Sequence, residues 1–506
     1  MKLPLVWIKE PRLLFRYDQR LEDPRDGLTL FGPLEQPRIY GVRAGVVGTQ
    51  EGIRRYKQWI RRIQQAIISN DEEKDAASYI YPGFKAVFGI DWHPDPVIEI
   101  PIPDDAFETL HITDKHHRVY ETVNLYEERI RKAINEEDPR VDVWFVVIPN
   151  EVYRDCRPRS EVKSRRASAK KISISPKRAR RLQTEPSLFT HENEAAKPYR
   201  FKNDFHNQLK ARLLDTRAIV QVVREITLAP EEFPQNEWLS EEKLIRLQAE
   251  IAWALSIATY YKAGGRPWKT ADVREGVCYL GLVFKQDSRN TDPRSACCAA
   301  QMFLDTGDGM IFKGRIGPWY NPKKSHFHLS RDAARDLVEK AVEDYKQKHP
   351  QQKPPKELFI HGRVGFNDEE WSGFREGAGK TTNVIGVYIQ DARFLRLYRP
   401  ANYSAMRGLA YVESPERAYL WTKGYTPRIQ SYPGREVPVP LYVRVCRGEA
   451  DIEVVLDDLM ALTKLNYNSA TFADGLPVTL RFADVIGEIL TAGPIDTPPL
   501  PFRHYI

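Results

Sequence analysis

The stretch GVCYLGLVFK, residues 276–285, opens the part of the sequence that decides the fold. It is the first of three β-type segments, because CAAQMFLD at 298–305 and GMIFKGR at 309–315 follow it after turn residues. A helical segment at 331–347 and a strand-like segment at 357–364 come next. Strands first, and then strands that alternate with helices, favour a mixed α/β sheet.

The preceding part of the chain also predicts α/β structure. The apolar run VDVWFVVI at 141–148 is typical of a strand buried on both faces of a parallel sheet. Apolar residues at helical spacing predict an amphipathic helix over 50–69. A long helix is predicted over 241–263, and two glycines end it. By contrast, LEDPRDGLTLFGPLE at 21–35 predicts turns that join short strands.

Most of the positive charge lies in one segment. Residues 157–181 hold eleven Lys or Arg residues and one acid, so this segment carries +10 while the whole chain carries +7. The segment is poor in large apolar residues, so we expect that it cannot bury a core and forms a mobile insertion. A polyanion-binding arm and a solvated loop are equally compatible with its composition.

Composition excludes several classes of protein. No run of eighteen apolar residues is present, so no membrane span is expected. Charges interrupt the early apolar stretch, so we expect no signal peptide and a cytoplasmic location. The five cysteines include no CxxC pair, which favours buried thiols over a zinc site or disulfides; they are Cys156, Cys278, Cys297, Cys298 and Cys446.

The segment GAGKTT at 377–382 resembles a phosphate-binding loop only superficially. The motif GxxxxGK[ST] needs glycine at position 374, where this sequence has Phe374. An acidic helical stretch precedes the glycines, whereas a phosphate-binding loop follows a buried strand. We therefore expect an ordinary loop and no nucleotide cofactor, although an ATPase stays an alternative.

Four polar residues form a more informative set. His206 and Lys210 lie four residues apart on a predicted helix and so share one face. Gln221 follows eleven residues later, and Lys262 lies in the last turn before Gly264 and Gly265. A solvated helix face and a cation at a helix C-terminus would explain the same pattern.

In this order, the four residues resemble the guide-binding pocket in the MID domain of Argonaute proteins. Eukaryotic Argonautes show Tyr-x3-Lys, Gln and Lys-Leu-Gly-Gly, and here His206 and Ala263 replace the tyrosine and the leucine. The similarity continues through DPRDGLTLFGPL at 23–34, LTKLNYNS at 462–469 and LPVTLRFAD at 476–484.

Further stretches are similar to the short prokaryotic Argonautes that pair with a TIR–APAZ protein, as in the SPARTA defence systems. They are YYKAGGRPW, CYLGLVFK, SACCAAQMFLD, GPWYNP and FNDEEW. This resemblance implies an α/β protein with a Rossmann-like MID domain followed by an RNase H-like PIWI domain. The implied domains are an N-terminal segment at 1–37 that packs on the PIWI lobe, a MID domain at 38–268 with the basic insertion at 157–198, and a PIWI domain at 269–506.

The resemblance also implies a ligand for the four residues. His206, Lys210, Gln221 and Lys262 would bind the 5′-phosphate of a guide RNA, with two ammonium groups facing the phosphate. Family members of the prokaryotic type place Mg²⁺ there, held partly by the terminal carboxylate, which implicates Ile506. Arg481 would contact the guide backbone.

Cleavage by an RNase H-like site needs clustered carboxylates that hold two metal ions. In Argonautes that cut, aspartates lie where the resemblance places Val283 and Arg363, whereas Asp484 matches an acidic position. A guanidinium near a bound metal ion would cost roughly 4 kcal/mol per unit charge at about 4 Å. We therefore expect no catalytic residue here, and a structural role for Asp484 such as a hydrogen bond or a helix cap.

The expected function is guided sensing without cutting. The chain would hold a guide RNA, capture complementary single-stranded DNA and activate a TIR–APAZ partner that hydrolyses NAD⁺ in defence against plasmids or phage. A heterodimer that forms a higher oligomer on target binding, with no membrane contact, is the implied assembly. The alternatives are a guided nuclease that uses Asp484, Glu488 and Asp368 or Glu369, or a partner with a sirtuin-like or nuclease effector.

Overall fold

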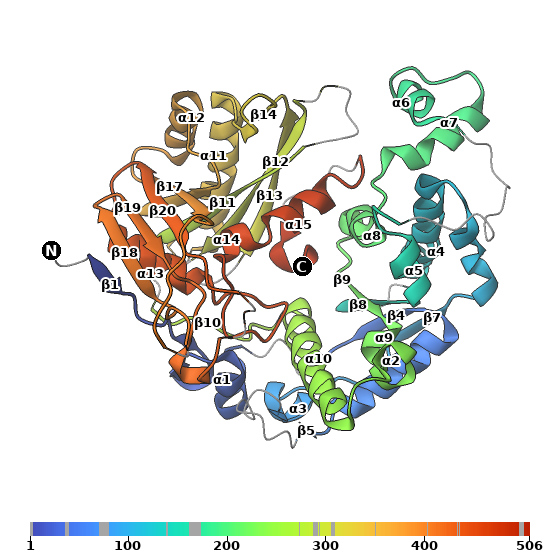
Figure 1. The fold of residues 1–506 in the computed structure, drawn as a ribbon. Helices are drawn as coiled ribbons and strands as arrows, with labels where there is room; N and C mark the ends of the chain where they lie inside the picture. Colours follow the sequence, from blue (N-terminus) through green and yellow to red (C-terminus); the bar gives the residue numbers. More distant parts are fainter. Residues whose placement is uncertain are drawn as a thin grey trace.

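The computed structural model describes most of the 506 residues. The residues that it leaves undescribed are 1–3, 36–39, 70–79, 138–139, 161–173, 273, 287–291, 293, 305–308, 350, 402, 433, 435 and 495–499. No helix of the described residues is long and apolar enough to cross a membrane. The described residues form two lobes, each built on its own sheet (Figure 1).

The first lobe contains a four-stranded parallel sheet with the strand order β7-β4-β8-β9. Its strands are β4 (Ala44–Gly48), β7 (Ile98–Pro101), β8 (Val143–Ile148) and β9 (Val220–Arg224). Every residue of β8 is buried, as the apolar run at 141–148 predicted. Alternate side chains of β8 enter two different apolar clusters, so the sheet is covered on both faces.

Helices cover the two faces of this sheet. The larger ones are α2 (Gln50–Ile63), α4 (Lys115–Glu136), α8 (Phe205–Leu213) and α10 (Glu241–Lys262). Short elements complete the lobe: β5 (Ile67–Ile68), β6 (Ile80–Tyr81), α3 (Phe84–Phe88), α5 (Asn150–Asp155) and α9 (Glu225–Leu228). Helix α2 ends earlier than predicted, because Ile67 pairs with Tyr81 in a small antiparallel sheet.

The second lobe contains a ten-stranded mixed sheet with the order β1-β18-β19-β20-β17-β16-β11-β12-β13-β21. Strands β11, β16 and β17 are mutually parallel, and the other neighbours are antiparallel. The strands are β1 (Leu5–Trp7), β11 (Val277–Gln286), β12 (Ala296–Leu304), β13 (Gly309–Gly317), β16 (Glu357–Gly362), β17 (Asn383–Asp391), β18 (Leu409–Ser414), β19 (Arg417–Leu420), β20 (Leu441–Arg447) and β21 (Leu500–Pro501).

Helices flank this larger sheet as well. On one face lie α11 (Arg331–Lys348) and α12 (Asp368–Ala378), whose apolar residues share a cluster with β11, β12 and β16. On the other face lie α13 (Ile452–Leu462), α14 (Val478–Arg481) and α15 (Ala483–Leu490), which belong to the cluster that continues into the first lobe. A mixed α/β fold, as predicted, is therefore observed. Two smaller sheets complete the described strands of this lobe. One is three-stranded, with the order β10 (Lys269–Thr270), β2 (Leu13–Leu14) and β3 (Arg20–Leu21), and the other pairs β14 (Tyr320–Asn321) with β15 (His326–Phe327).

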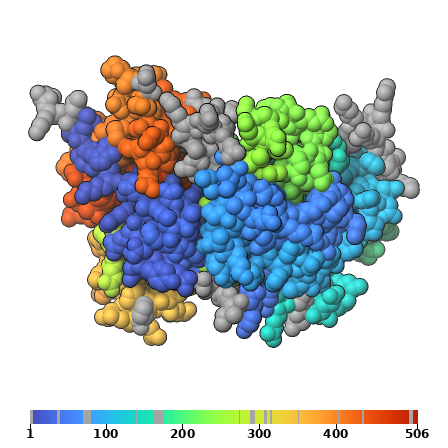
Figure 2. Space-filling model, turned by 90° about the horizontal axis from the view of Figure 1, so that it is seen from below, coloured from blue at the N-terminus to red at the C-terminus, as the bar shows by residue number. Residues whose placement is uncertain are grey.

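The N-terminal residues contact the second lobe, and one of their elements differs from the prediction. Strand β1 pairs with β18 at the edge of the large sheet, and Figure 2 shows the dark-blue N-terminal residues beside the orange C-terminal lobe and the lighter-blue first lobe. The prediction of turns throughout 21–35 is wrong, because α1 (Pro24–Phe31) is helical. Asp23 caps it by accepting from the backbone N–H groups of Arg25 and Asp26, and Pro24 occupies the first turn.

Part of the basic segment folds into helices. Residues 161–173 lie outside the described residues, but α6 (Pro176–Thr184) and α7 (Thr190–Ala196) are present. The expectation that the segment cannot bury a core is wrong for this second half, because a small cluster of Ile174, Ala179, Leu182, Ala196 and Tyr199 is buried. The mobility of the segment stays a prediction.

Candidate nucleic-acid interface

Two lysines from different helices meet at a buried site between the lobes. Lys210 lies on α8 and Lys262 is the last residue of α10, and their exposed fractions are 4% and 1%. Lys210 Nζ donates to the Ile506 oxygen at 2.7 Å and to the Tyr505 carbonyl at 3.3 Å. Lys262 Nζ donates to Gln221 Oε1 at 2.6 Å. The structure therefore brings together residues that are separated by up to 296 positions in the sequence.

Burial lowers the pKa values of both lysines. Burial lowers the pKa of Lys210 to about 7. Burial, and then repulsion from Lys210, lowers the pKa of Lys262 well below its usual value. Removing an ammonium group from water is costly unless an anion compensates it. An anionic ligand would restore both charges, so this site has the electrostatics of an anion-binding site.

His206 lies at the same site but does not add a third charge. It is partly buried on the first turn of α8, and its Nδ1 is 3.2 Å from Asn207 Oδ1. Burial, together with the charges of Lys210 and Lys262, lowers its pKa to about 3. His206 is therefore neutral at physiological pH, which suits stacking or a neutral hydrogen bond better than ion pairing.

The last residues of the chain run from the large sheet to the lysines. Strand β21 pairs with β13, and Phe502–His504 then form a short 3-10 helix. Tyr505 and Ile506 are buried, with exposed fractions of 1% and 4%. Periodicity and spacing give no signal for this contact, because Lys210 and Ile506 are 296 positions apart in the sequence.

A glycine lies where the C-terminal segment approaches α10. Gly264 follows Ala263, the C-cap residue of α10, and its φ of +97° is rare for residues with a side chain. A Cβ atom at this position would also lie 3.1 Å from Arg503 Nη1. The glycine that the sequence marked as a helix stop therefore also allows the C-terminal segment to approach α10.

A second polar cluster connects the two lobes beside α8. Glu488 on α15 pairs with Lys202 and with Lys285 of β11, each at 2.6 Å. Burial raises the pKa of Glu488, but hydrogen bonds and charges from the two lysines outweigh it and lower the pKa overall. The carboxylate of Glu488, one of the alternative nuclease residues, is thus engaged in ion pairs.

The predicted remnant of a cleavage site surrounds a cavity of about 280 Å³ at the ends of β11 and β16. Arg363 and Asp484 both line it. Val283 is buried on β11, near the position of Gly487 on α15. Arg363 Nη2 reaches the Leu480 carbonyl at 3.5 Å. Arg363 and Asp484 therefore share this cavity, whereas Val283 is buried beneath α15 and does not line it.

Asp484 lies exposed near the start of a helix and makes no capping hydrogen bond there. It is exposed in the first turn of α15, where a negative charge is favourable, but the N-cap of this helix is Phe482 without a side-chain hydrogen bond. Asp484 therefore does not cap α15, which was one of the two structural roles expected for it, and its place near the helix N-terminus suits its charge.

Sequence reasoning missed a buried carboxylate at the same cavity. Glu370 is 1% exposed and lines the cavity. Its oxygens accept from the N–H groups of Leu329 and Asn367 and pair with His328 Nδ1 at 2.8 Å. The signal was present as Asn367-x-x-Glu370, a capping box at the start of α12. Glu370 therefore holds α12 against the loop before α11.

The other candidate acids lie apart from this cavity. Asp368 begins α12, and its carboxylate pairs with Arg447. Glu369 is exposed on the same turn. Among the described residues, no three His, Cys, Asp or Glu side chains are grouped so that they could hold a metal ion.

Arg481 ends the short helix α14 and is exposed. Its Nε lies 3.4 Å from Asp474 Oδ1, and half of its side-chain surface faces solvent. The guanidinium is therefore partly exposed and lies beside Asp474.

The GAGKTT segment is not a phosphate-binding loop in this structure. Gly377 and Ala378 are the last residues of α12, and the strand β17 starts only at Asn383. A helix precedes the glycines and a strand follows them, which is the reverse of the strand–loop–helix order that phosphate binding requires.

Comparisons with known proteins identify the fold. No protein-family model matches the sequence, and no curated protein matches it. Among solved structures, Clostridium butyricum Argonaute bound to a guide DNA and a 19-mer target DNA is similar with a TM-score of 0.65 at 15% identity, over 100% of this chain and 55% of that one. Drosophila Piwi is similar with a TM-score of 0.58 at 13% identity, over 99% and 56%.

The chain therefore spans about half the length of the structures that it matches. At these identities the likeness establishes the fold, which is that of the Argonaute MID and PIWI domains, as the sequence predicted.

Proposed function

We propose that this chain holds a guide RNA by its 5′-phosphate and captures complementary single-stranded DNA without cutting it. The observation that carries the proposal is the meeting of two buried lysines, Lys210 and Lys262, beside Gln221 and Ile506, with pKa values that burial lowers. A terminal phosphate supplies up to two negative charges and several acceptor oxygens. The protein fixes the guide end, and base pairing reads the target.

The neighbouring residues suit a phosphate at this place. Gln221 accepts from Lys262 through Oε1, and its Nε2 donates to the Val222 carbonyl at 3.1 Å, which leaves the second N–H of the amide for an anion or a base edge. His206 is neutral and partly exposed, so its ring can stack on the first base of the guide. These roles apply equally to RNA and DNA guides, and the choice of RNA rests on the resemblance alone.

A divalent cation is compatible with this donor set. The terminal carboxylate proposed at Ile506 and the Gln221 amide oxygen are hard oxygen ligands, and Mg²⁺ commonly combines one or two such ligands with phosphate oxygens and water. When bound, Mg²⁺ would neutralise phosphate charge. Lys210 meanwhile orients the Ile506 oxygen, to which it donates in this structure.

The remnant of the cleavage site supports sensing without cutting. Arg363 lines the cavity where carboxylates would have to hold metal ions, and Val283 offers no ligand. If the chain binds its target without cutting it, another protein must produce the biological effect. We further propose that a TIR–APAZ partner produces this effect by hydrolysing NAD⁺.

The test of this output uses the pair of proteins co-purified as a complex. We expect nicotinamide release only when both a guide and a complementary DNA strand are present. A non-complementary strand of equal length is the control. Release that does not depend on complementarity would contradict guided activation, and sequencing the co-purified nucleic acid would give the length, sugar type and 5′ end of the natural guide.

The preference for a 5′-phosphate should depend on pH. Lys210 loses its proton above about pH 7. The affinity for a 5′-phosphorylated guide, relative to that for a 5′-hydroxyl guide, should therefore fall between about pH 7 and pH 9. The fall should be up to about tenfold per pH unit. Below this range Lys210 is charged and the preference should level off. Fluorescence anisotropy with both guides measures the ratio.

The matched control for this titration is Lys210→Arg. Its guanidinium stays protonated throughout the range, so the preference should change less with pH. A wild-type preference that stays constant from about pH 7 to pH 9 would contradict the role of Lys210.

A further inference from the structure

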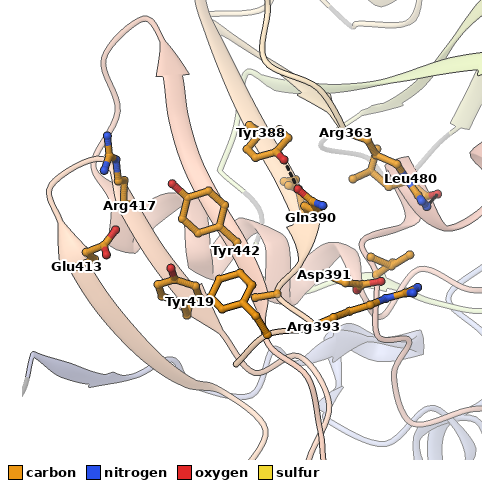
Figure 3. Close-up of a pocket in the computed structure, with 14 residues that line it drawn as sticks. Arg363, Tyr388, Gln390, Asp391, Arg393, Glu413, Arg417, Tyr419, Tyr442 and Leu480 are labelled. Atoms are coloured by element: carbon orange, nitrogen blue, oxygen red, sulfur yellow. Dashed lines mark hydrogen bonds between the residues drawn. The ribbon is translucent and has the colours of Figure 1, made fainter. Parts of the chain in front are cut away.

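One face of the large sheet is open beside the proposed cleavage remnant. Along β17, β20 and β19, alternate residues such as Val387, Val443 and Ala418 point toward α13 and its cluster. The intervening residues point to the opposite face. Several of these side chains line a cavity of about 890 Å³ (Figure 3).

Tyrosines form a row across this open face. Tyr411, Tyr419 and Tyr442 are direct cross-strand neighbours on β18, β19 and β20. Their ring centroids are 6.1 and 5.3 Å apart, and Tyr388 lies 6.0 Å from Tyr442. All four rings keep part of their surface exposed. Phe394 extends the row at the rim, with 80% of its surface exposed.

Two arginines form a second row directly beside the tyrosines. Arg417 and Arg444 are opposite each other on β19 and β20. Like charges at such positions destabilise a sheet. Arg444 lies over the Tyr388 ring, and its Nε is buried without a hydrogen-bond partner. No ion pair within 4.0 Å joins either arginine to a carboxylate of the described residues.

The cavity as a whole has an excess of positive charge. Arg363, Arg393 and Arg417 line it together with the acids Asp391 and Glu413, and Arg444 adjoins them. Arg363 also lines the smaller cavity with Asp484, so the two cavities meet at this residue. Figure 3 shows the tyrosine rings and Arg417 on the strands and Arg363 at the opposite side.

We propose that this face binds single-stranded nucleic acid, with bases stacked on Tyr419 and Tyr442 and backbone phosphates beside Arg417 and Arg444. Aromatic rings interleaved with arginines bind single strands without sequence preference, because every base has a face that can stack. A phosphate would also relieve the repulsion between the paired arginines. Because the two cavities meet at Arg363, we assign the bound single strand of nucleic acid as the unpaired flank of a captured target. This assignment rests on the proposed function.

The first experiment does not need a guide. Fluorescence anisotropy of a 5′-hydroxyl oligothymidine with the full-length chain measures binding that cannot use a terminal phosphate. We expect Tyr419→Ala/Tyr442→Ala to weaken this binding by at least about tenfold. Arg417→Ala should weaken it and reduce the dependence of log affinity on log salt by about one. The controls are Tyr40→Ala and Arg61→Ala, both exposed on the other lobe.

The second experiment adds a guide and compares a target of guide length with targets that carry an unpaired flank on either side. The flank should tighten binding to the wild type, and the double tyrosine variant should lose this gain while it binds the unflanked target normally. Failure of the unflanked target to bind would count against the proposed function instead. Oligothymidine binding that the tyrosine and arginine variants retain would overturn the inference. If a co-purifying protein is then lost from these variants, the face belongs to a protein partner.

Discussion

Replacing Lys210 and Lys262 together with methionine should lower the affinity for a 5′-phosphorylated guide by at least about 100-fold, and should leave a 5′-hydroxyl guide almost unaffected. Each ammonium group would make a charged hydrogen bond to the phosphate, and such bonds contribute about 1.5–3 kcal/mol. Binding of both guides to the purified variant, measured by anisotropy at neutral pH, gives the ratio directly.

Methionine keeps the size of lysine without its charge, so the variant should fold. The unfolded chain holds a proton on Lys210 between about pH 7 and pH 10.5, whereas the folded chain does not. The unfolded state therefore binds more protons in this range, and stability rises with pH there. At neutral pH the wild type bears the cost of the buried charges, so the methionine variant should melt at an equal or higher temperature.

The control for the lysine prediction removes two charges of the same kind elsewhere. Lys132 and Lys340 are exposed on α4 and α11, and Lys132→Met/Lys340→Met changes the net charge equally. This control should bind the phosphorylated guide nearly as well as the wild type. An equal loss in both double variants would mean that the effect is general attraction to nucleic acid, and that the assignment of the phosphate site is wrong.

The sequence predicted the elements that local patterns specify. Strand β8 has an uninterrupted apolar run, and α10 has a serine cap and is followed by glycines. Lys210 and Lys262 could be singled out because each lies at a fixed place on such an element. Their convergence could be expected only through the resemblance, since spacing alone is also explained by solvated helix faces.

The contacts that complete the sites depend on long-range pairing, which local patterns do not encode. The Lys210–Ile506 contact joins α8 to the end of the chain. The tyrosine row requires the register of β18, β19 and β20, in which a shift of one residue would turn every ring to the other face. In α1 a local signal existed, because Asp23 and Pro24 start the helix despite Gly27, but the density of turn residues concealed it.

Gly27 also shows why that stretch is glycine-rich and yet helical. A Cβ atom at this position would lie 2.1 Å from the ring of Phe15. Gly27 therefore allows α1 to pack against Phe15. This close packing offsets the low helix propensity of glycine.

The wild-type chain should not cut a guided target, and two substitutions should create a metal site in its cleavage remnant. We expect no product at a guide-defined position with either Mg²⁺ or Mn²⁺. Val283→Asp/Arg363→Asp should bind Mn²⁺ at least about 100-fold more tightly than the wild type, because it removes one positive charge and adds two carboxylates near Asp484. Calorimetry or the Mn²⁺ resonance signal measures this affinity.

The positions of residues 283 and 363 in the structure are the reason to expect tighter Mn²⁺ binding from these two substitutions. β11 and β16 are parallel neighbours with Gly281 opposite His361, so Val283 and Arg363 follow at equivalent distances along the two strands. Arg363 shares its cavity with Asp484, and Val283 packs near Gly487 on the same helix. Val283→Asn/Arg363→Asn is the matched control, since it changes size and polarity similarly without adding charge. Equal Mn²⁺ binding by both double variants would refute the placement of the remnant, whereas guide-positioned cleavage by the wild type would refute the proposal that the chain only senses its target.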